Sequence, residues 1–517
     1  MLRMTAEYYF MYTAIETFLN KKNRIQIIFS VLLWFLSIFS ILVGVIKGGM
    51  PFWNDPARDL LLAVDNIRKL TLIGPPSGIP GIFYGPYWIW ILSVPLLITR
   101  DPRFVVFFTL WIPYLILFPF IILKFKPFSH SLTRIGIISL FLVSYNQYGI
   151  FLWNPHLAPF LFLILFVVLF SMPFERKLRY FLGGLITGII VTFHISFGLG
   201  ILIAVSLYIL TETLRTEFTG NRLLKDKLHK TAFKLILFVI GVIISFLPFL
   251  VFESRHGWMQ GRAFFHAGSE SLINNASVVS QKGLTGIQII QTFLNVPQNL
   301  FSIHNNLFSI FFLIILISGV FIFHVHKTDK NIGHAHMLKF LSISLVIPMI
   351  IYLVSRNPVW EYHFIGFEMV IILISAIFLE KIKILRYIFI VWVIFLSFSS
   401  FIKTVDSLPG DPRLVSGLAS KEDAVKVIKA DAKNSSVVYF AYAPSLYTYD
   451  YDYLFKWLIP GKTFSILGAT PIYLIIPKSS DAVTEDFINY RTPRGKYHTD
   501  KRWDLIDKTI ILKRVKT

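Results

Sequence analysis

Apolar runs long enough to cross a membrane follow one another through most of the chain, and they constrain its fold more than any other feature. The first runs from Ile25 to Ile46, directly after a basic cluster. A helix needs about 20 residues to cross the hydrocarbon core, and a lone segment in lipid satisfies its backbone only as a helix. We interpret about eleven runs as spans: 25–47, 103–123, 133–153, 157–172, 179–196, 197–212, 233–252, 306–325, 337–355, 361–379 and 384–402.

The composition supports a membrane protein and argues against a nucleic-acid partner. Hydrophobic residues make up 55% of the chain and charged residues 15%, compared with about 25% charged residues in soluble domains. The net charge is +21, but its lysines and arginines stand in short clusters between the apolar runs. The positive-inside rule places such clusters in cytoplasmic loops. The chain has no cysteine, which excludes disulfides and thiolate metal sites.

Charge also decides how the segment 84–98 is interpreted. This segment is apolar but short, and it contains Pro95. If it crossed the membrane, two basic clusters would lie outside, against the positive-inside rule. We therefore interpret it as re-entrant or interfacial, which places residues 1–24 in the cytoplasm and the C-terminus outside. Every basic cluster is then cytoplasmic: Lys124/Lys126/Arg134, Arg176/Lys177/Arg179, Arg215 to Lys234, Lys327/Lys330/Lys339 and Lys381/Lys383/Arg386.

This topology predicts a transmembrane domain over 25–403 and three extracytoplasmic elements. Two are loops, 48–102 and 253–305, and the third is a small α/β domain over 404–517. Apolar patterning predicts its helices and strands. The expected helices are Lys421–Asp431 and Tyr451–Leu458, and the expected strands are Ser436–Ala443, Pro471–Pro477 and Lys508–Val515.

The first loop carries the densest group of polar chemistry. Asp55, Arg58 and Asp59 stand within about one helical turn, where the membrane meets water. A carboxylate can act as a general base on a hydroxyl, and an arginine can hold a phosphate through two hydrogen bonds. A purely structural interpretation of Asp55 is equally open, because aspartate is a favoured N-cap and Pro56 suits a first helical turn.

The helix that follows Asp55 is expected to lie at the membrane surface. Leu60, Val64, Ile67 and Thr71 would form its apolar face, and Phe52 and Trp53 would sit at headgroup depth. Glycines and prolines between residues 74 and 81 predict a rigid loop next to it.

These two stretches resemble a known family. "NDPARDLLLA" (54–63) and "GPPSGIPGIFYGPYWIWIL" (74–92) are similar to bacterial C-type (GT-C) glycosyltransferases related to protein mannosyltransferases and to the aminoarabinose transferase of lipid A. Weaker similarities follow in order along the chain: "WNPHLAPF" (153–160), "FESRHGWMQGRAF" (252–264), "EYHFIGFE" (361–368) and "YDYDYLFKWL" (449–458). One departure is that many relatives have an acidic residue directly beside the first-loop aspartate, whereas here its neighbours are Asn54 and Pro56.

The resemblance implies an inverting transferase of the outer face of the cytoplasmic membrane. It would move a sugar from a polyprenyl-phosphate carrier to a hydroxyl of a lipid, glycan or protein acceptor. Asp55 matches the proposed catalytic base of the family, and Arg58 is the candidate for contact with the carrier phosphate. Further substrate-binding candidates stand at the outer ends of the spans or in the first loop: Asp59, Tyr84, Asn154, His156, Arg255, His256, Glu361 and His363.

Each further candidate also has a plain structural interpretation. Asn154 and His156 flank a helix-breaking proline, Arg255 and His256 begin a loop, and charged residues such as Glu361 are common at span ends. No histidine pattern fits a zinc site and no glycine-rich nucleotide loop is present, so no cofactor or divalent metal is expected. The alternatives are a secondary transporter, a polysaccharide polymerase or ligase acting on lipid-linked substrates, and a non-catalytic scaffold. A transporter would concentrate ionisable residues in mid-span, where Glu368 is the exception to watch.

Overall fold

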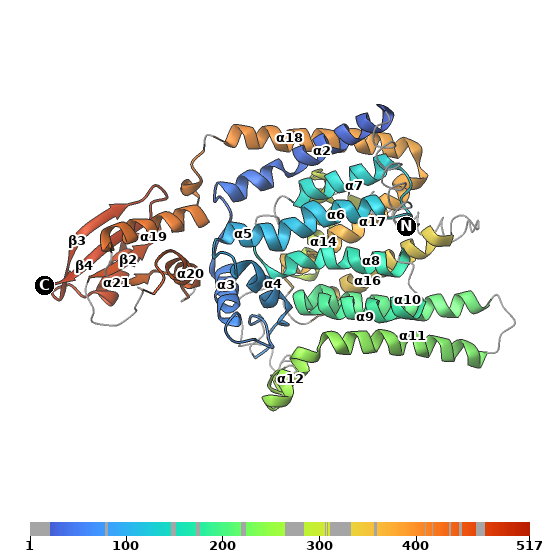
Figure 1. Cartoon of the computed structure of the whole chain (residues 1–517), viewed down its shortest axis with the longest axis horizontal. Helices are drawn as coiled ribbons and strands as arrows, with labels where there is room; N and C mark the ends of the chain where they lie inside the picture. The colour runs from blue at the N-terminus through green and yellow to red at the C-terminus, as the bar shows by residue number, and fades with distance from the viewer. Residues whose placement is uncertain are drawn as a thin grey trace, which may run out of the picture.

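The structure is a computed structural model that shows a helical bundle with an α/β unit beyond one of its ends (Figure 1). Helices α3 (Asn54–Asn66) and α4 (Tyr87–Leu96) lie between the two parts. It describes residues 21–77, 81–145, 151–171, 176–218, 224–263, 284–305, 307, 309–310, 332–355, 359–408, 410–415, 417–433, 436–443, 447–461 and 471–517.

The bundle forms because the apolar runs of the sequence become helices that pack side by side. Figure 1 shows α2, α7, α8, α9, α10, α11 and α18 running roughly parallel. The bundle elements are α2 (Lys21–Ile46), α5 (Pro102–Val106), η1 (Phe107–Leu117), α6 (Phe118–Lys124), α7 (Ser131–Ser144), η3 (Asn154–Leu157), α8 (Ala158–Phe170), α9 (Arg176–Phe193), α10 (Ile195–Phe218), α11 (Leu224–Ser245), α12 (Leu247–Arg255), α14 (Gly286–Phe301), α16 (Ile332–Val354), η5 (Glu361–Phe364), α17 (Phe367–Lys381) and α18 (Lys383–Ser407).

Several of these helices are long and apolar enough to cross a membrane. Within the described residues five meet that test: Ile27–Ile46, Pro102–Lys124, Gly333–Val354, Glu361–Lys381 and Lys383–Ser407. A sixth span forms if α11 and α12, which meet at a bend of 59°, are counted as one. Shorter apolar helices cover Tyr87–Leu96, Ser131–Ser144, Asn154–Phe170 and Ile195–Thr211. The expected count of about eleven stays a prediction, since most of the expected span 306–325 and the terminus 1–20 lie outside the described residues.

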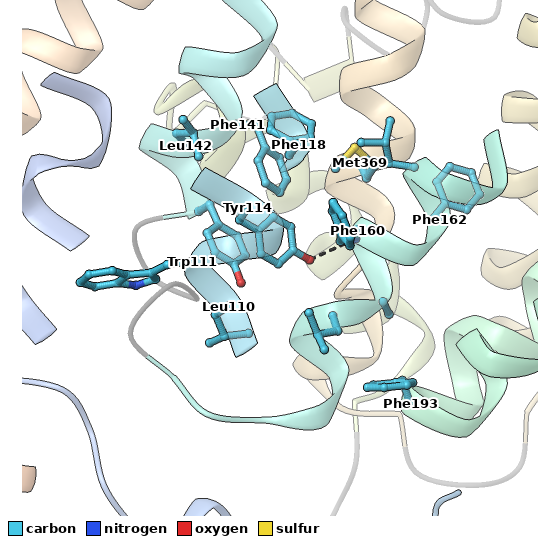
Figure 2. Packing of buried hydrophobic residues seen from close by; sticks show 14 of the residues in the cluster. Leu110, Trp111, Tyr114, Phe118, Phe141, Leu142, Phe160, Phe162, Phe193 and Met369 are labelled. Carbon is cyan, nitrogen blue, oxygen red and sulfur yellow. Dashed lines mark hydrogen bonds between the residues drawn. The ribbon is translucent and has the colours of Figure 1, made fainter. Parts of the chain in front are cut away.

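Helix α17 lies at the centre of the bundle and α2 at its edge. In α17, 78% of the apolar stretch is buried, whereas the corresponding share in α2 is 22%. Figure 2 shows part of the core beside α17, where Tyr114 and Phe118 pack against Phe141. The hydroxyl of Tyr114 donates to the carbonyl of His156 (2.5 Å) and accepts from the backbone N–H of Phe160 (3.0 Å). Both hydrogen bonds satisfy polar groups where no water is available.

Basic residues gather at the end of the bundle away from the α/β unit. Lys177 lies over the ring of Phe233, and Arg386 donates to the carbonyls of Leu379 (2.9 Å) and Glu380 (3.0 Å) at the C-terminus of α17. A cation there also interacts favourably with the helix dipole. This grouping agrees with the clusters that we expect on one side of the membrane.

The α/β unit contains a four-stranded sheet of order β1-β2-β4-β3. Strands β1 and β2 are parallel, and β4 is antiparallel to both of its neighbours. Every residue of β2 is buried, so this strand forms the centre of the unit. The elements are η6 (Pro412–Leu414), α19 (Leu418–Ala432), β1 (Val438–Ala441), α20 (Tyr449–Leu458), β2 (Ile472–Ile476), α21 (Asp481–Arg491), β3 (Tyr497–Asp504) and β4 (Ile510–Lys516).

The helices and strands predicted for this unit all form, but the short 3-10 turn η6, strand β3 and helix α21 were not predicted. Strand β3 is almost entirely exposed, and α21 has no buried residue, so neither carries the apolar pattern that identifies an element from sequence. The last bundle helix also extends a few residues farther than expected, to Ser407.

The first loop differs from expectation in two details. Leu60 and Val64 are buried as predicted, but α3 ends at Asn66, so Ile67 is exposed beyond the helix. Phe52, which we expected at headgroup depth, is buried and contacts the ring of Tyr453 in α20. Helix α4 has ten residues, about 15 Å in length, which is too short to cross the hydrocarbon core and agrees with a non-crossing segment.

Candidate active site

Three charged residues on the first turns of α3 form one hydrogen-bonded group. The Nη1 atom of Arg58 donates to Asp55 (2.9 Å), and its Nε and Nη2 atoms donate to Asp59 (3.0 and 2.8 Å). The i, i+3 spacing places the first pair on one helix face. The Asp55 side chain is 43% exposed, whereas that of Asp59 is 1% exposed. Only Asp55 of the two carboxylates is therefore accessible to a substrate.

Asp55 is not the N-cap of α3. Trp53 occupies that position, and no side chain caps the helix there. Asp55 lies in the first turn, and its carboxylate accepts a hydrogen bond from Arg58. The structural interpretation that the sequence allowed for Asp55 is therefore wrong in its N-cap form, although the residue remains well placed in the field of the helix N-terminus.

The carboxyl group of Asp59 changes its protonation state near pH 6. Burial raises the pKa of Asp59 to about 6, although the charge of Arg58 and hydrogen bonds from Arg58 and Trp88 act to lower it. The indole Nε1 of Trp88, in α4, donates to the second oxygen of Asp59 (2.9 Å). Above pH 6 the Asp59 carboxylate is ionised and balances Arg58. Below pH 6 it is protonated, and Arg58 then faces Asp55 as the remaining negative charge of this group.

Tyr84 approaches the same group from a narrow hairpin formed by the glycine- and proline-rich loop. Its N–H donates to the carbonyl of Pro75 (2.9 Å), and its carbonyl accepts from Gly74 (2.8 Å). A Cβ at Gly74 would lie 2.2 Å from the carbonyl oxygen of Gly85, so this close pairing requires glycine. Burial, and then the neighbouring Tyr362, raise the pKa of Tyr84 above its ordinary value, while Arg58 acts to lower it. The phenol therefore stays protonated and can donate a hydrogen bond.

A series of half-buried aromatic rings leads from Trp53, at the start of α3, to Tyr362 in η5. The ring centroid of Trp53 lies 5.3 Å from that of Phe151 and 6.4 Å from that of Trp153. Trp153 in turn lies 5.2 Å from Tyr362. We call Trp53, Phe151, Trp153 and Tyr362 the aromatic rim. Sequence reasoning named Glu361 and His363 but missed Tyr362, because only the fold brings η5 beside the start of α3.

Asn154 and His156 lie behind the aromatic rim. Both are buried: Asn154 donates to the carbonyl of Phe193 (2.7 Å), and a ring nitrogen of His156 bonds the carbonyl of Phe151 (3.1 Å). His194, at the break between α9 and α10, similarly bonds the carbonyl of Tyr362 (3.0 Å). These contacts join three separate segments and fix the rim, so both predicted residues are close to the site without facing its carboxylates.

The remaining candidates are placed differently from one another. Glu361 is exposed beside Tyr362, and His363 accepts from the N–H of Trp360 (3.2 Å). Arg255 and His256 are exposed at the end of α12, and in the described part of the chain neither contacts the Asp55 group. The ring of His256 stacks on Phe252 of its own helix.

A buried carboxylate connects the second loop to the first. Glu253 accepts from the N–H groups of Gln260 (3.2 Å) and Gly261 (2.9 Å). The side chain of Gln260 then accepts from the N–H of Phe83 (2.8 Å), next to Tyr84. Across the described ranges, no three histidine or acidic side chains are arranged to hold a metal ion.

Comparison with known proteins identifies the fold. No protein-family model matches the sequence, and no curated protein matches it. The apo structure of ArnT from Cupriavidus metallidurans superposes with a TM-score of 0.57 at 8% identity, covering 95% of this chain and 97% of ArnT. The structure of the same protein bound to undecaprenyl phosphate gives a TM-score of 0.59 at 9% identity with the same coverage.

The chain is thus a multi-pass membrane protein with the GT-C fold, as the first-loop motif predicted. The superposition covers nearly the whole length of both proteins, so it includes the bundle and the α/β unit together. At this identity, what the two proteins share is the fold.

Proposed function

We propose that this protein is a membrane glycosyltransferase that moves a sugar from a polyprenyl-phosphate carrier to an acceptor hydroxyl at the outer face of the cytoplasmic membrane. The observation that carries the proposal is the half-exposed Asp55 paired with Arg58 at the start of α3, where Trp53 of the aromatic rim also lies. A structural neighbour bound to undecaprenyl phosphate supports a carrier of this class.

The proposed reaction is a direct displacement at the anomeric carbon. The Asp55 carboxylate takes the proton of the acceptor hydroxyl while its oxygen forms the new glycosidic bond. The bond from the anomeric carbon to the phosphate oxygen breaks, and its electron pair leaves with the polyprenyl phosphate. Attack from the opposite face inverts the anomeric centre.

Arg58 can hydrogen-bond both the carboxylates of the site and the phosphate of the carrier lipid. Its guanidinium has five N–H donors, and the contacts to Asp55 and Asp59 use three of them. The other donors are available to the carrier phosphate as negative charge develops on it. Tyr84, which stays protonated, is a further donor on the same side.

The alternative that the protein is a secondary transporter depends on Glu368. The position of Glu368 in the fold favours an enzyme. Glu368 lies in the first turn of α17 and accepts from the N–H of Gly366 (2.9 Å). A carboxylate at this position stabilises a helix N-terminus. This contact gives Glu368 a structural role in the first turn of α17, and its side chain also lines a small cavity with Tyr145 and Asn299.

Lipid analysis of cells with and without the protein tests the proposal and identifies the donor. Mass spectrometry of the carrier pool should show one polyprenyl-phosphate-linked sugar accumulating in cells that lack the protein. The acceptor should lose the matching sugar. Identical carrier pools and identical acceptors in both cells would contradict the proposal.

Loss of one ring from the aromatic rim is expected to weaken substrate binding. Aromatic faces pack against the C–H faces of sugars, and one such contact contributes about 1 kcal/mol, or about fivefold in binding. Trp153→Ala should raise KM for the sugar donor or acceptor about fivefold, while Trp153→Phe keeps a ring and most of the affinity. Steady-state kinetics on both variants measures this. Equal KM values for Trp153→Ala and wild type would show that the aromatic rim does not bind the substrate.

The pKa of Asp59 predicts how the rate of sugar transfer depends on pH. As pH falls through about 6, Asp59 takes a proton, and Arg58 is left to hold Asp55 away from the acceptor hydroxyl. Wild-type kcat should therefore rise between pH 5 and 7 with an apparent pKa of about 6. In Asp59→Asn this rise should be absent and kcat at pH 8 about tenfold lower, the equivalent of one pKa unit of interaction. If Asp59→Asn keeps the rise near pH 6, another group is responsible.

A further inference from the structure

The α/β unit holds the backbone of the segment that leads into α3. Residues 48–52 connect the first bundle helix to α3, and we call them the strap. The carbonyls of Gly48 and Met50 accept from the backbone N–H groups of Ala419 and Leu418 (3.0 Å each). The carbonyl of Phe52 accepts from Nζ of Lys421 (2.7 Å). All three donors belong to the first turn of α19.

The backbone geometry of the strap and of the first turn of α19 explains these hydrogen bonds. The three strap carbonyls that accept these bonds stand at alternate positions, 48, 50 and 52, and all face the first turn of α19. The first N–H groups of a helix have no partner within the helix, and its N-terminus attracts negative partial charge. The strap therefore supplies the partners that α19 lacks, and α19 fixes the strap in one register.

Two glycines allow the backbones to approach this closely. Gly48 has φ +77°, and a Cβ there would lie 2.8 Å from Nη2 of Arg103 and 3.2 Å from Cβ of Ala419. A Cβ at Gly417 would lie 2.9 Å from the carbonyl oxygen of Met50. Neither residue can gain a side chain without moving the strap, so the contact is specified in both parts of the chain.

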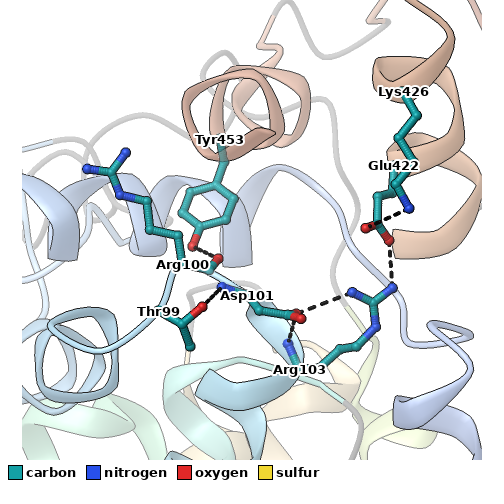
Figure 3. Close-up of polar contacts among 7 residues, drawn as sticks. All are labelled: Thr99, Arg100, Asp101, Arg103, Glu422, Lys426 and Tyr453. Atoms are coloured by element: carbon teal, nitrogen blue, oxygen red, sulfur yellow. Dashed lines mark hydrogen bonds and ion pairs between the residues drawn. The ribbon is translucent and has the colours of Figure 1, made fainter. Parts of the chain in front are cut away.

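Further contacts hold the end of the first loop to the same unit. Figure 3 shows Arg103 between Asp101 (3.2 Å) and Glu422 of α19 (2.6 Å). The hydroxyl of Tyr453 donates to the carbonyl of Arg100 (2.6 Å), also drawn in Figure 3. The first loop is thus held near both of its ends.

Lys421 connects the strap to the rest of the α/β unit. It pairs with Asp450 of α20 while it donates to Phe52. Its side chain is 14% exposed and that of Asp450 is 13% exposed, so solvent screens the pair little. Phe52 is three residues before Asp55, at the entry to the helix that carries the candidate base.

We infer that the α/β unit acts as a clamp that sets the position of Asp55, and that Lys421 is a positioning residue for the transfer reaction. This inference rests on the proposed function. The contacts described for the unit are with the strap, the ends of the first loop and α3 itself. A displacement of about 1 Å in a reacting group costs up to about 100-fold in rate.

Two variants and a matched control test the clamp. Lys421→Met removes the bond to Phe52, and Gly417→Ala pushes on Met50 without a change of charge. Lys429→Met changes an exposed lysine on the same helix. We expect kcat to fall about 10- to 100-fold in the first two variants, with KM for the polyprenyl-linked donor within about twofold of wild type, and no change in Lys429→Met. A kcat for Lys421→Met and Gly417→Ala equal to that of Lys429→Met would overturn the inference.

Hydrogen exchange gives a readout that does not depend on activity. Amide protons in the peptide covering residues 48–60 should exchange faster in Lys421→Met than in wild type or Lys429→Met. Unchanged exchange there would overturn the clamp even if transfer is confirmed. Faster exchange in a protein that transfers no sugar would instead leave the clamp in place and refute the proposed function.

Discussion

Asp55→Asn is expected to lower kcat for sugar transfer by about 10²- to 10⁴-fold, the range that a positioned general base contributes. The carboxamide keeps the size of the side chain and can still accept from Arg58, but it cannot take the proton of the acceptor hydroxyl. KM for the lipid-linked donor should change little. Transfer of radiolabelled sugar by the purified variant, at matched protein concentration, measures the effect.

Asp65→Asn is the matched control for this change. Asp65 lies on the same helix, 66% exposed, and pairs with Lys456 at the surface, where such pairs contribute little to stability. Its variant should transfer sugar at the wild-type rate. A near-normal rate for Asp55→Asn would show that the base is another group and would remove Asp55 from the mechanism.

Arg58→Met is expected to affect both stability and activity. Without Arg58 the buried Asp59, whose pKa is about 6 even beside that cation, must take a proton or stay as an uncompensated charge, and the cost reaches about 3–5 kcal/mol only where the charge stays. Loss of the donor to the carrier phosphate should also lower kcat by about 10²- to 10³-fold. Thermal unfolding of the purified protein and steady-state kinetics separate the two effects.

The double variant Arg58→Met with Asp59→Asn distinguishes these roles. Without a buried charge to compensate, its thermal stability should return close to that of wild type, while kcat should stay low. If the double variant regains activity together with stability, Arg58 serves only to neutralise Asp59. If Arg58→Met alone is as stable as wild type, the pair of Arg58 and Asp59 does not contribute to the stability of the fold.

Much of the fold could be predicted from hydrophobicity and charge. Helix positions in the bundle follow from the length of the apolar runs, and the α/β unit follows from strands such as 472–476, whose residues are all apolar and all buried. The exposed strand β3 gave no such signal. Likewise, no local pattern could indicate that Phe52 is buried against α20, because that contact joins residues about 400 positions apart.

The candidate site was predicted in part. Asp55, Arg58 and Asp59 were identified because they stand together in sequence and remain together on one helix. The aromatic rim was not, because Trp53, Trp153 and Tyr362 come from three separate segments. The different environments of the two carboxylates also depend on packing: Asp59 is enclosed by α4 through Trp88, whereas Asp55 is one turn nearer to solvent.

Consumption of a polyprenyl-phosphate-linked sugar by the purified protein is the most direct test of the account. The protein would be incubated with the carrier lipids and acceptor extract of its own membranes, and free polyprenyl phosphate would be measured by mass spectrometry. We predict that wild-type protein releases polyprenyl phosphate as the sugar reaches the acceptor and that Asp55→Asn releases almost none. Equal release by both proteins, or no release by wild type, would contradict the proposed function.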